Sequence, residues 1–151
     1  MKLPGLLLVL LAAAVPLLTQ CEKSTHDMSR HAAGDTTFAK NAFSSLAKGE
    51  AAAAAMLDWN TLTIFGRNLG AEYAEITSEV EKEKYRTTFI SNFATSFRES
   101  GGNINALANW RVVHHDTMKT EVAADSANGV LTIVVMNKDG VDKVVSLNLV
   151  K

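Results

Sequence analysis

The sequence predicts an α+β domain in which N-terminal helices pack on one face of a curved antiparallel sheet of three to four strands. Two patterns support this prediction. Between residues 35 and 100, apolar residues recur every three to four positions, as in an amphipathic helix. After Gly102 they alternate with polar residues, as in a β-strand. Helices followed by strands, in a chain long enough for one core, indicate an α+β domain.

Residues 1–20 have the composition of an export signal. Lys2 supplies one positive charge, and an almost uninterrupted apolar run extends from Leu3 to Leu18. A helix over this run would be about 24 Å long at 1.5 Å per residue, which is shorter than the ~30 Å hydrocarbon core of a bilayer. A cleaved signal is therefore expected rather than a permanent membrane span.

The apolar run ends in Leu18-Thr19-Gln20-Cys21, and Cys21 is the only cysteine of the chain. This junction resembles the lipobox of bacterial lipoproteins, in which the cysteine is acylated and the chain is cut just before it. Leu18 and Thr19 are compatible with that pattern, whereas Gln20 departs from the small residue usual there. The resemblance implies that lipidated Cys21 holds the protein on a membrane, because two or three acyl chains anchor a protein stably. The alternatives are an uncut N-terminal anchor or a buried free cysteine.

This interpretation divides the chain into a signal peptide (1–20), a flexible tether (21–34) and a single α+β domain (35–151). The tether is polar and shows no apolar periodicity. Its histidines, His26 and His31, lack further ligands at the spacing of a metal site. Glu22 replaces the aspartate that often marks retention at the inner membrane, so the outer membrane, facing the periplasm, is the expected location.

Charge and motifs exclude several classes of function. The net charge is −1 and basic residues are not clustered, so a nucleic-acid partner is not expected. The sequence has no glycine-rich phosphate loop, nucleophile elbow, zinc-protease motif or calcium loop. We therefore expect no cofactor and no metal, and a protein that is not an enzyme.

Three helical segments are expected at the start of the domain. Asp35 is placed to cap the first, which Gly49 ends. The alanine-rich stretch 50–57 forms the second, because alanine loses no side-chain entropy on ordering. The third covers 61–69 and presents three apolar residues on one face: Leu62, Phe65 and Leu69.

The strongest local signal begins a fourth helix. Ser78 and Glu81 have the spacing of a capping box, in which the serine hydroxyl accepts from the Glu81 amide and the Glu81 carboxylate reaches back. Behind the cap, aromatic residues repeat every four positions until Gly101-Gly102: Tyr85, Phe89, Phe93 and Phe97. This aromatic ridge requires burial.

Four extended segments follow, at 110–115, 118–124, 130–137 and 141–150. Asn128-Gly129 and Asp139-Gly140 separate the last three and favour the positive φ angles of hairpin turns. The third strand is apolar on both faces, so it is expected to be central. Leu131, Ile133 and Val135 share one face, and Val130, Val134 and Met136 share the other. The second face needs a cover, from a partner chain, a ligand or the curvature of the sheet.

Helices followed by a bent sheet resemble the NTF2-like or cystatin-like cone. Residues 52–98 also resemble the helical part of the MlaC and Ttg2D family of periplasmic phospholipid carriers. That resemblance rests on Asp58-Trp59, on Leu69-Gly70, and on a charged helix start that leads to spaced aromatic residues between Glu79 and Phe97. This chain is shorter than those carriers and has a lipid anchor where they are soluble.

The excess of apolar side chains on both sheet faces predicts a non-catalytic domain that binds an apolar ligand, such as a lipid, or a partner protein between helices and sheet. The candidate ligand contacts are aromatic: Trp59, Phe65, Tyr85, Phe89, Phe93 and Trp110. One alternative is a structural module that forms a homodimer through its sheet.

The other alternative is an NTF2-like enzyme. It would use Asp58 with Tyr73 or Tyr85, or else His114 with Asp116, which share one face of a strand. Adjacent His114 and His115 point to opposite faces and cannot both serve one site. Asp58 is better explained as the cap of the helix that follows it, and the histidines as a strand end that enters solvent.

Overall fold

The computed structural model describes residues 19–151, with side chains from residue 34 onward. The predicted signal peptide up to Leu18 lies outside the described residues. The helices are α1 (Thr19–Lys48), α2 (Ala53–Met56), α3 (Leu69–Ala74), α4 (Glu79–Glu99) and the 3₁₀ helix η1 (Ile104–Ala106). The strands are β1 (Thr63–Ile64), β2 (Arg67–Asn68), β3 (Ala108–His115), β4 (Lys119–Ser126), β5 (Gly129–Lys138) and β6 (Val141–Val150). The protein is α+β, as the sequence predicts.

The described chain forms one six-stranded sheet in the order β2-β1-β6-β5-β4-β3. The four long strands make the antiparallel meander that the sequence predicts. The additional hairpin β1–β2 joins through β1, which runs parallel to β6 with Thr63 opposite Ser146. The prediction of three to four strands was therefore too low, and the sheet is mixed rather than purely antiparallel.

The prediction of a helix over residues 61–69 was wrong. Phe65 and Gly66 have φ angles of 49° and 81° and close a two-residue turn between β1 and β2. The amide of Phe65 donates to the carbonyl of Leu147 on β6 at 2.8 Å. Leu62 and Leu69 are buried as expected, but they flank a hairpin rather than sharing a helical face.

Helix α1 is one continuous element of 30 residues. The stretch 21–34, expected as a flexible tether, has a helical backbone, and Asp35 lies inside the helix rather than at its N-cap. No proline interrupts this stretch, and a single Gly34 inside a helix costs only about 1 kcal/mol. The Asp35 carboxylate instead accepts a hydrogen bond from Thr120 on β4, which ties α1 to the sheet.

Helix α4 begins and ends as its sequence predicts. The Ser78 hydroxyl accepts from the Glu81 amide at 3.5 Å. At the other end the Gly102 amide donates to the Phe97 carbonyl at 2.8 Å, and that of Gly101 to the Arg98 carbonyl at 3.0 Å. This pair of bonds is the Schellman motif, and Gly101 supplies its positive φ of 77°.

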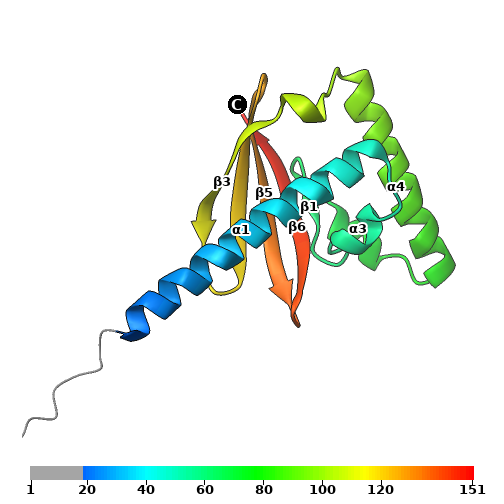
Figure 1. Ribbon diagram of the computed structural model, residues 1–151. Helices are drawn as coiled ribbons and strands as arrows, with labels where there is room; N and C mark the ends of the chain where they lie inside the picture. Colours follow the sequence, from blue (N-terminus) through cyan, green and yellow to red (C-terminus); the bar gives the residue numbers. More distant parts are fainter. Residues whose placement is uncertain (1–18) are drawn as a thin grey trace, which may run out of the picture.

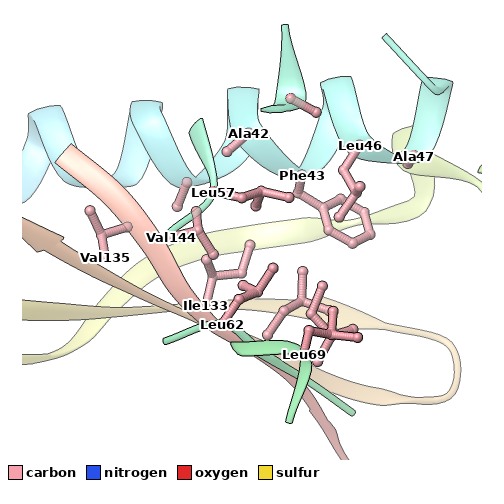
Figure 2. Close-up of a cluster of buried hydrophobic side chains, with 14 of the residues drawn as sticks. Ala42, Phe43, Leu46, Ala47, Leu57, Leu62, Leu69, Ile133, Val135 and Val144 are labelled. Carbon is pink, nitrogen blue, oxygen red and sulfur yellow. The ribbon is translucent and has the colours of Figure 1, made fainter. Parts of the chain in front are cut away.

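The helices lie on one face of the sheet (Figure 1). α1 crosses that face, and its N-terminal half extends past the sheet. Figure 2 shows the core between α1 and the strands, in which Phe43 and Leu46 face Leu62 and Ile133. α4 packs chiefly on α1 and α2 rather than on the strands. The fold therefore leaves space between α4 and the sheet.

Strand β5 has the two faces that the sequence predicts. Leu131, Ile133 and Val135 are buried under the helices, and β5 lies between β4 and β6. The residues of the other face are half-buried: Val130, Val134 and Met136. No helix of the described chain covers that face (Figure 1).

One of the two predicted hairpin turns is confirmed, and the other lies one residue earlier than predicted. Asp139-Gly140 closes β5–β6 as expected, with φ angles of 53° and 81°. The β4–β5 turn consists of Ala127 and Asn128, because Gly129 already pairs with Ser126 at the start of β5. Gly129 is needed for another reason: a Cβ there would meet the carbonyl of Val150.

Candidate functional site: an aromatic cavity between α4 and the sheet

A cavity of about 1110 Å³ lies between α4, the β1–β2 hairpin and the ends of the central strands. This volume is slightly above the range of about 300–1,000 Å³ usual for small-molecule sites. Besides the aromatic ridge, large apolar residues of eight elements or connections line it: Phe43, Ile64, Phe65, Leu69, Ile76, Leu107, Leu131 and Leu149. The cavity is thus bounded by residues more than 100 positions apart in the chain.

All four residues of the aromatic ridge line this cavity, and each is half-buried. Phe97 stacks beside Phe93 with ring centroids 6.4 Å apart. Phe43 of α1 meets both rings edge-on, at 6.3 Å and 5.6 Å. The ridge was expected to be buried by packing. Phe43 covers the ridge at Phe93 and Phe97, other packing covers it at Tyr85 and Phe89, and its remaining surface borders the cavity.

Four of the six candidate ligand contacts line the cavity: Phe65, Tyr85, Phe89 and Phe93. The two tryptophans do not. Trp59 is 6% exposed, and its indole N–H donates to the Ala54 carbonyl at 2.9 Å. Its ring packs against Tyr85 and Phe89 from behind, so it supports the wall. Trp110, on β3, packs on the core away from the cavity.

Sequence reasoning missed several wall residues. Phe97 belongs to the predicted ridge, and its period of four was the signal that could have included it. Phe43 lies on the apolar face of the first predicted helix, but nothing local connects that face to α4. Leu131 and Leu149 join the wall only through strand pairing.

Charged groups lie at the end of the cavity formed by the start of α4: Arg67, Glu81 and Lys84. Arg67 binds Glu72 through two hydrogen bonds of 2.6 Å, and the Tyr85 hydroxyl donates to the same carboxylate at 3.0 Å. The other end is polar but uncharged: Ser96, Ser100, Asn103, Ser126 and Asn128. Thr88 and Asn92 of α4 add polar groups between these ends, so the cavity is mainly apolar along its length and charged at one end only.

Tyr85 is a hydrogen-bond donor at neutral pH. Burial and its bond to the Glu72 carboxylate raise the pKa of the Tyr85 hydroxyl to about 12. The Arg67 guanidinium in turn outweighs desolvation and holds the pKa of Glu72 below its ordinary value. A phenol with so high a pKa cannot act as a base near neutral pH.

Asp58 does not line the cavity. Its carboxylate is 7% exposed and accepts from the Thr61 hydroxyl at 2.8 Å, the Asn60 amide at 3.2 Å and the Lys138 ammonium. Burial acts to raise its pKa, but the Lys138 bond and the other donors outweigh burial and lower it. Asp58 caps a tight turn, not a helix, so the predicted helix cap was wrong.

The histidine cluster also lies outside the cavity. His114 Nε2 is 3.5 Å from the Asp116 carboxylate, so these two share a face as expected, and both side chains are exposed. His115 points the other way, with its Nδ1 2.6 Å from the Thr120 hydroxyl. Among the described residues, no three His, Cys, Asp or Glu side chains converge as a metal site would require.

Comparison of the chain with protein families, curated proteins and solved structures finds no match. Among residues 19–151, no helix combines the length and apolar character needed to cross a bilayer.

Proposed function

We propose that this protein is a membrane-anchored bacterial lipoprotein whose domain binds an apolar ligand, such as a lipid, without catalysis. The observation that carries the proposal is the cavity of about 1110 Å³ walled by the aromatic ridge. Half-buried aromatic rings beside a cavity of this size leave apolar surface that a ligand would remove from water, at about 25 cal/mol for each Å².

The shape of the wall favours an elongated ligand. From Tyr85 to Phe97 the ridge rises about 18 Å at 1.5 Å per residue, similar to the length of an acyl chain. Its middle part offers mainly rings and aliphatic side chains, with Thr88 and Asn92 as its polar residues, and the charged groups lie at one end. A single apolar chain with a polar end group matches this distribution.

The topology supports an NTF2-like or cystatin-like cone for this domain. Helices cover one face of a sheet whose hairpin and long strands enclose the cavity from the side opposite α4. The resemblance of residues 52–98 to the MlaC and Ttg2D carriers is compatible with a lipid ligand. The wall uses the same ridge on which that resemblance rests.

The anchor places the cavity away from the membrane. Cys21 lies in the first turn of α1, and Phe43, 22 residues later on the same helix, reaches the cavity. A continuous helix spans about 33 Å between them at 1.5 Å per residue. An outer-membrane anchor would thus hold the cavity in the periplasm, where the ligand arrives by transfer rather than by direct insertion from the bilayer.

Dye binding tests the ligand site. The full-length protein should bind the apolar dye 1-N-phenylnaphthylamine with a rise in fluorescence, and Phe93→Glu should weaken binding at least about tenfold by placing a charge in the wall. Val113→Glu is the matched control, because Val113 is 50% exposed on β3 and does not line the cavity. No binding by the unaltered protein would refute the ligand site.

The anchor has its own test. The intact mass of protein extracted from its membrane should correspond to residues 21–151 plus acyl groups, and Cys21→Ser should be unacylated. A full-length, unmodified mass would mean that Gln20 prevents processing.

A second candidate is a module that dimerises through its sheet. The observation that favours it is the row Val130, Val134 and Met136, which no helix of the described chain covers. Light scattering at high concentration should then give twice the monomer mass, and Val134→Lys should restore the monomer. A monomer at every concentration rules this candidate out.

A further inference from the structure

The chain contains two hairpin turns of nearly the same backbone geometry. In β1–β2 the turn residues Phe65 and Gly66 have φ angles of 49° and 81°, and in β5–β6 Asp139 and Gly140 have 53° and 81°. Such turns need positive φ at both positions, for which Asp-Gly and Asn-Gly are the favoured pairs. The β5–β6 turn follows this preference, whereas the β1–β2 turn places a phenylalanine where an aspartate or asparagine is easier to accommodate.

A bulky residue at positive φ costs free energy and marks a position where the side chain itself has a role. Burial does not explain Phe65, which is 52% exposed. Its ring instead lies parallel to that of Phe93, with centroids 6.2 Å apart and planes 16° from each other, and it lines the cavity. The turn therefore holds an exposed aromatic ring against the middle of the aromatic ridge.

The backbone beneath this ring is fixed on three sides. The amide of Phe65 donates to Leu147, Thr63 and Ile64 pair with β6, and Arg67 is bound by Glu72. Glu72 is held in turn by Tyr85 of α4. A hairpin secured in this way does not need to open as a whole, and the part that is free to move is the exposed ring, whose rotation is fast.

We propose that Phe65 is the gate of the cavity: its ring covers the ligand against Phe93, and it swings aside to let the ligand enter and leave. This inference rests on the proposed ligand-binding function and assigns the residue that controls exchange. The ring contributes stacking and excludes water from the bound chain, so its loss should change the rate of release more than the rate of entry, and should make release faster.

The experiment measures release of 1-N-phenylnaphthylamine from the full-length protein by stopped-flow dilution. Phe65→Asn suits the turn better than phenylalanine does, but it removes the ring. We expect release to be about tenfold faster, with a thermal midpoint within about 3 °C of the unaltered protein. Phe65→Tyr keeps a ring and should release the dye at the original rate.

Asp139→Asn is the matched control, because it introduces the same residue at the corresponding position of the other turn, and Asp139 lies outside the cavity wall. Its release rate should not change. An unchanged release rate in Phe65→Asn overturns the proposal that Phe65 is the gate. Release from Phe65→Tyr as fast as from Phe65→Asn overturns it as well. A thermal midpoint lower by 10 °C or so in Phe65→Asn also overturns it, since the ring would then be structural. If the unaltered protein binds no dye, the result refutes the proposed ligand site, on which the gate rests, and not the role of Phe65 alone.

Discussion

At the scale of single residues, Asp58 and Tyr85, which an NTF2-like enzyme could use as catalytic groups, are bound by other side chains of the domain. Asp58 is bound by Lys138, Thr61 and Asn60, and Tyr85 donates to Glu72. Each bond satisfies a polar atom at the edge of the core, where an unpaired group would cost about 1–3 kcal/mol. The pKa shifts of Asp58 and Tyr85 therefore have structural causes, and each cause can be tested.

Asp58→Asn should lower the free energy of unfolding at neutral pH by about 1–3 kcal/mol, because it leaves Lys138 without its anionic partner. The pKa of Asp58 is lowered in the folded state. Its contribution is therefore present above the unfolded pKa of about 3.9 and is lost as pH falls through the folded value. Urea unfolding at several pH values should show the two proteins converging in acid. A difference in the free energy of unfolding that does not change with pH would contradict this. The exposed Glu99→Gln variant is the control.

Tyr85 gives a second test by titration. The chain has only two tyrosines, so in the Tyr73→Phe variant Tyr85 is the single tyrosine whose ionisation changes the absorbance. Its ionisation should be centred near pH 12, since burial and Glu72 both disfavour the phenolate. Circular dichroism recorded on the same samples shows whether the fold persists. A transition near pH 10 in protein that is still folded would show that the Glu72 bond is absent.

At the scale of elements, the parts that the sequence predicts well are those with local causes. α4 follows from its cap, its period and its terminal glycines, and β5 from an apolar run on both faces between two turn signals. The β1–β2 hairpin was missed because each strand has two residues and depends on Ser146, 83 positions further along the chain. Its apolar spacing fits a helix equally well, and long-range pairing decides between them.

The cavity was predictable only in part, for the same reason. Three of the candidate contacts came from the ridge, whose period of four is visible in the sequence. Phe65 was chosen as part of a helix that does not exist, and it lines the cavity from a turn instead. Trp59 and Trp110 were predicted as contacts too, but whether a ring faces the cavity or the core depends on packing that the sequence does not reveal.

The continuity of α1 can be tested at Gly34, where an added Cβ meets nothing within 4 Å. If the helix runs through this position, Gly34→Ala should stabilise the protein by about 0.5–1 kcal/mol and increase helical circular dichroism. Gly101→Ala provides the contrast, because its φ of 77° should cost about 1–2 kcal/mol. A loss of stability in Gly34→Ala would show that the helix begins later.

At the scale of the whole molecule, one helix links Cys21 to the cavity. α1 carries Cys21 at its start and Phe43 at the cavity, so the proposed lipid anchor on Cys21 would attach the domain through a rod rather than a loose chain. That rod would hold the cavity at a fixed distance from the lipid surface. Such a geometry would suit the proposed role of receiving or presenting an apolar ligand in the periplasm.

Mass spectrometry of the purified protein tests most directly whether the cavity holds an apolar ligand. Full-length protein, Phe93→Glu and Val113→Glu are purified in parallel from membranes, exchanged into one detergent, and extracted with organic solvent. We expect a lipid-like compound at a near-constant ratio to protein in the unaltered protein and in Val113→Glu, and its loss from Phe93→Glu. Equal lipid content in all three proteins, or none in any, would contradict it.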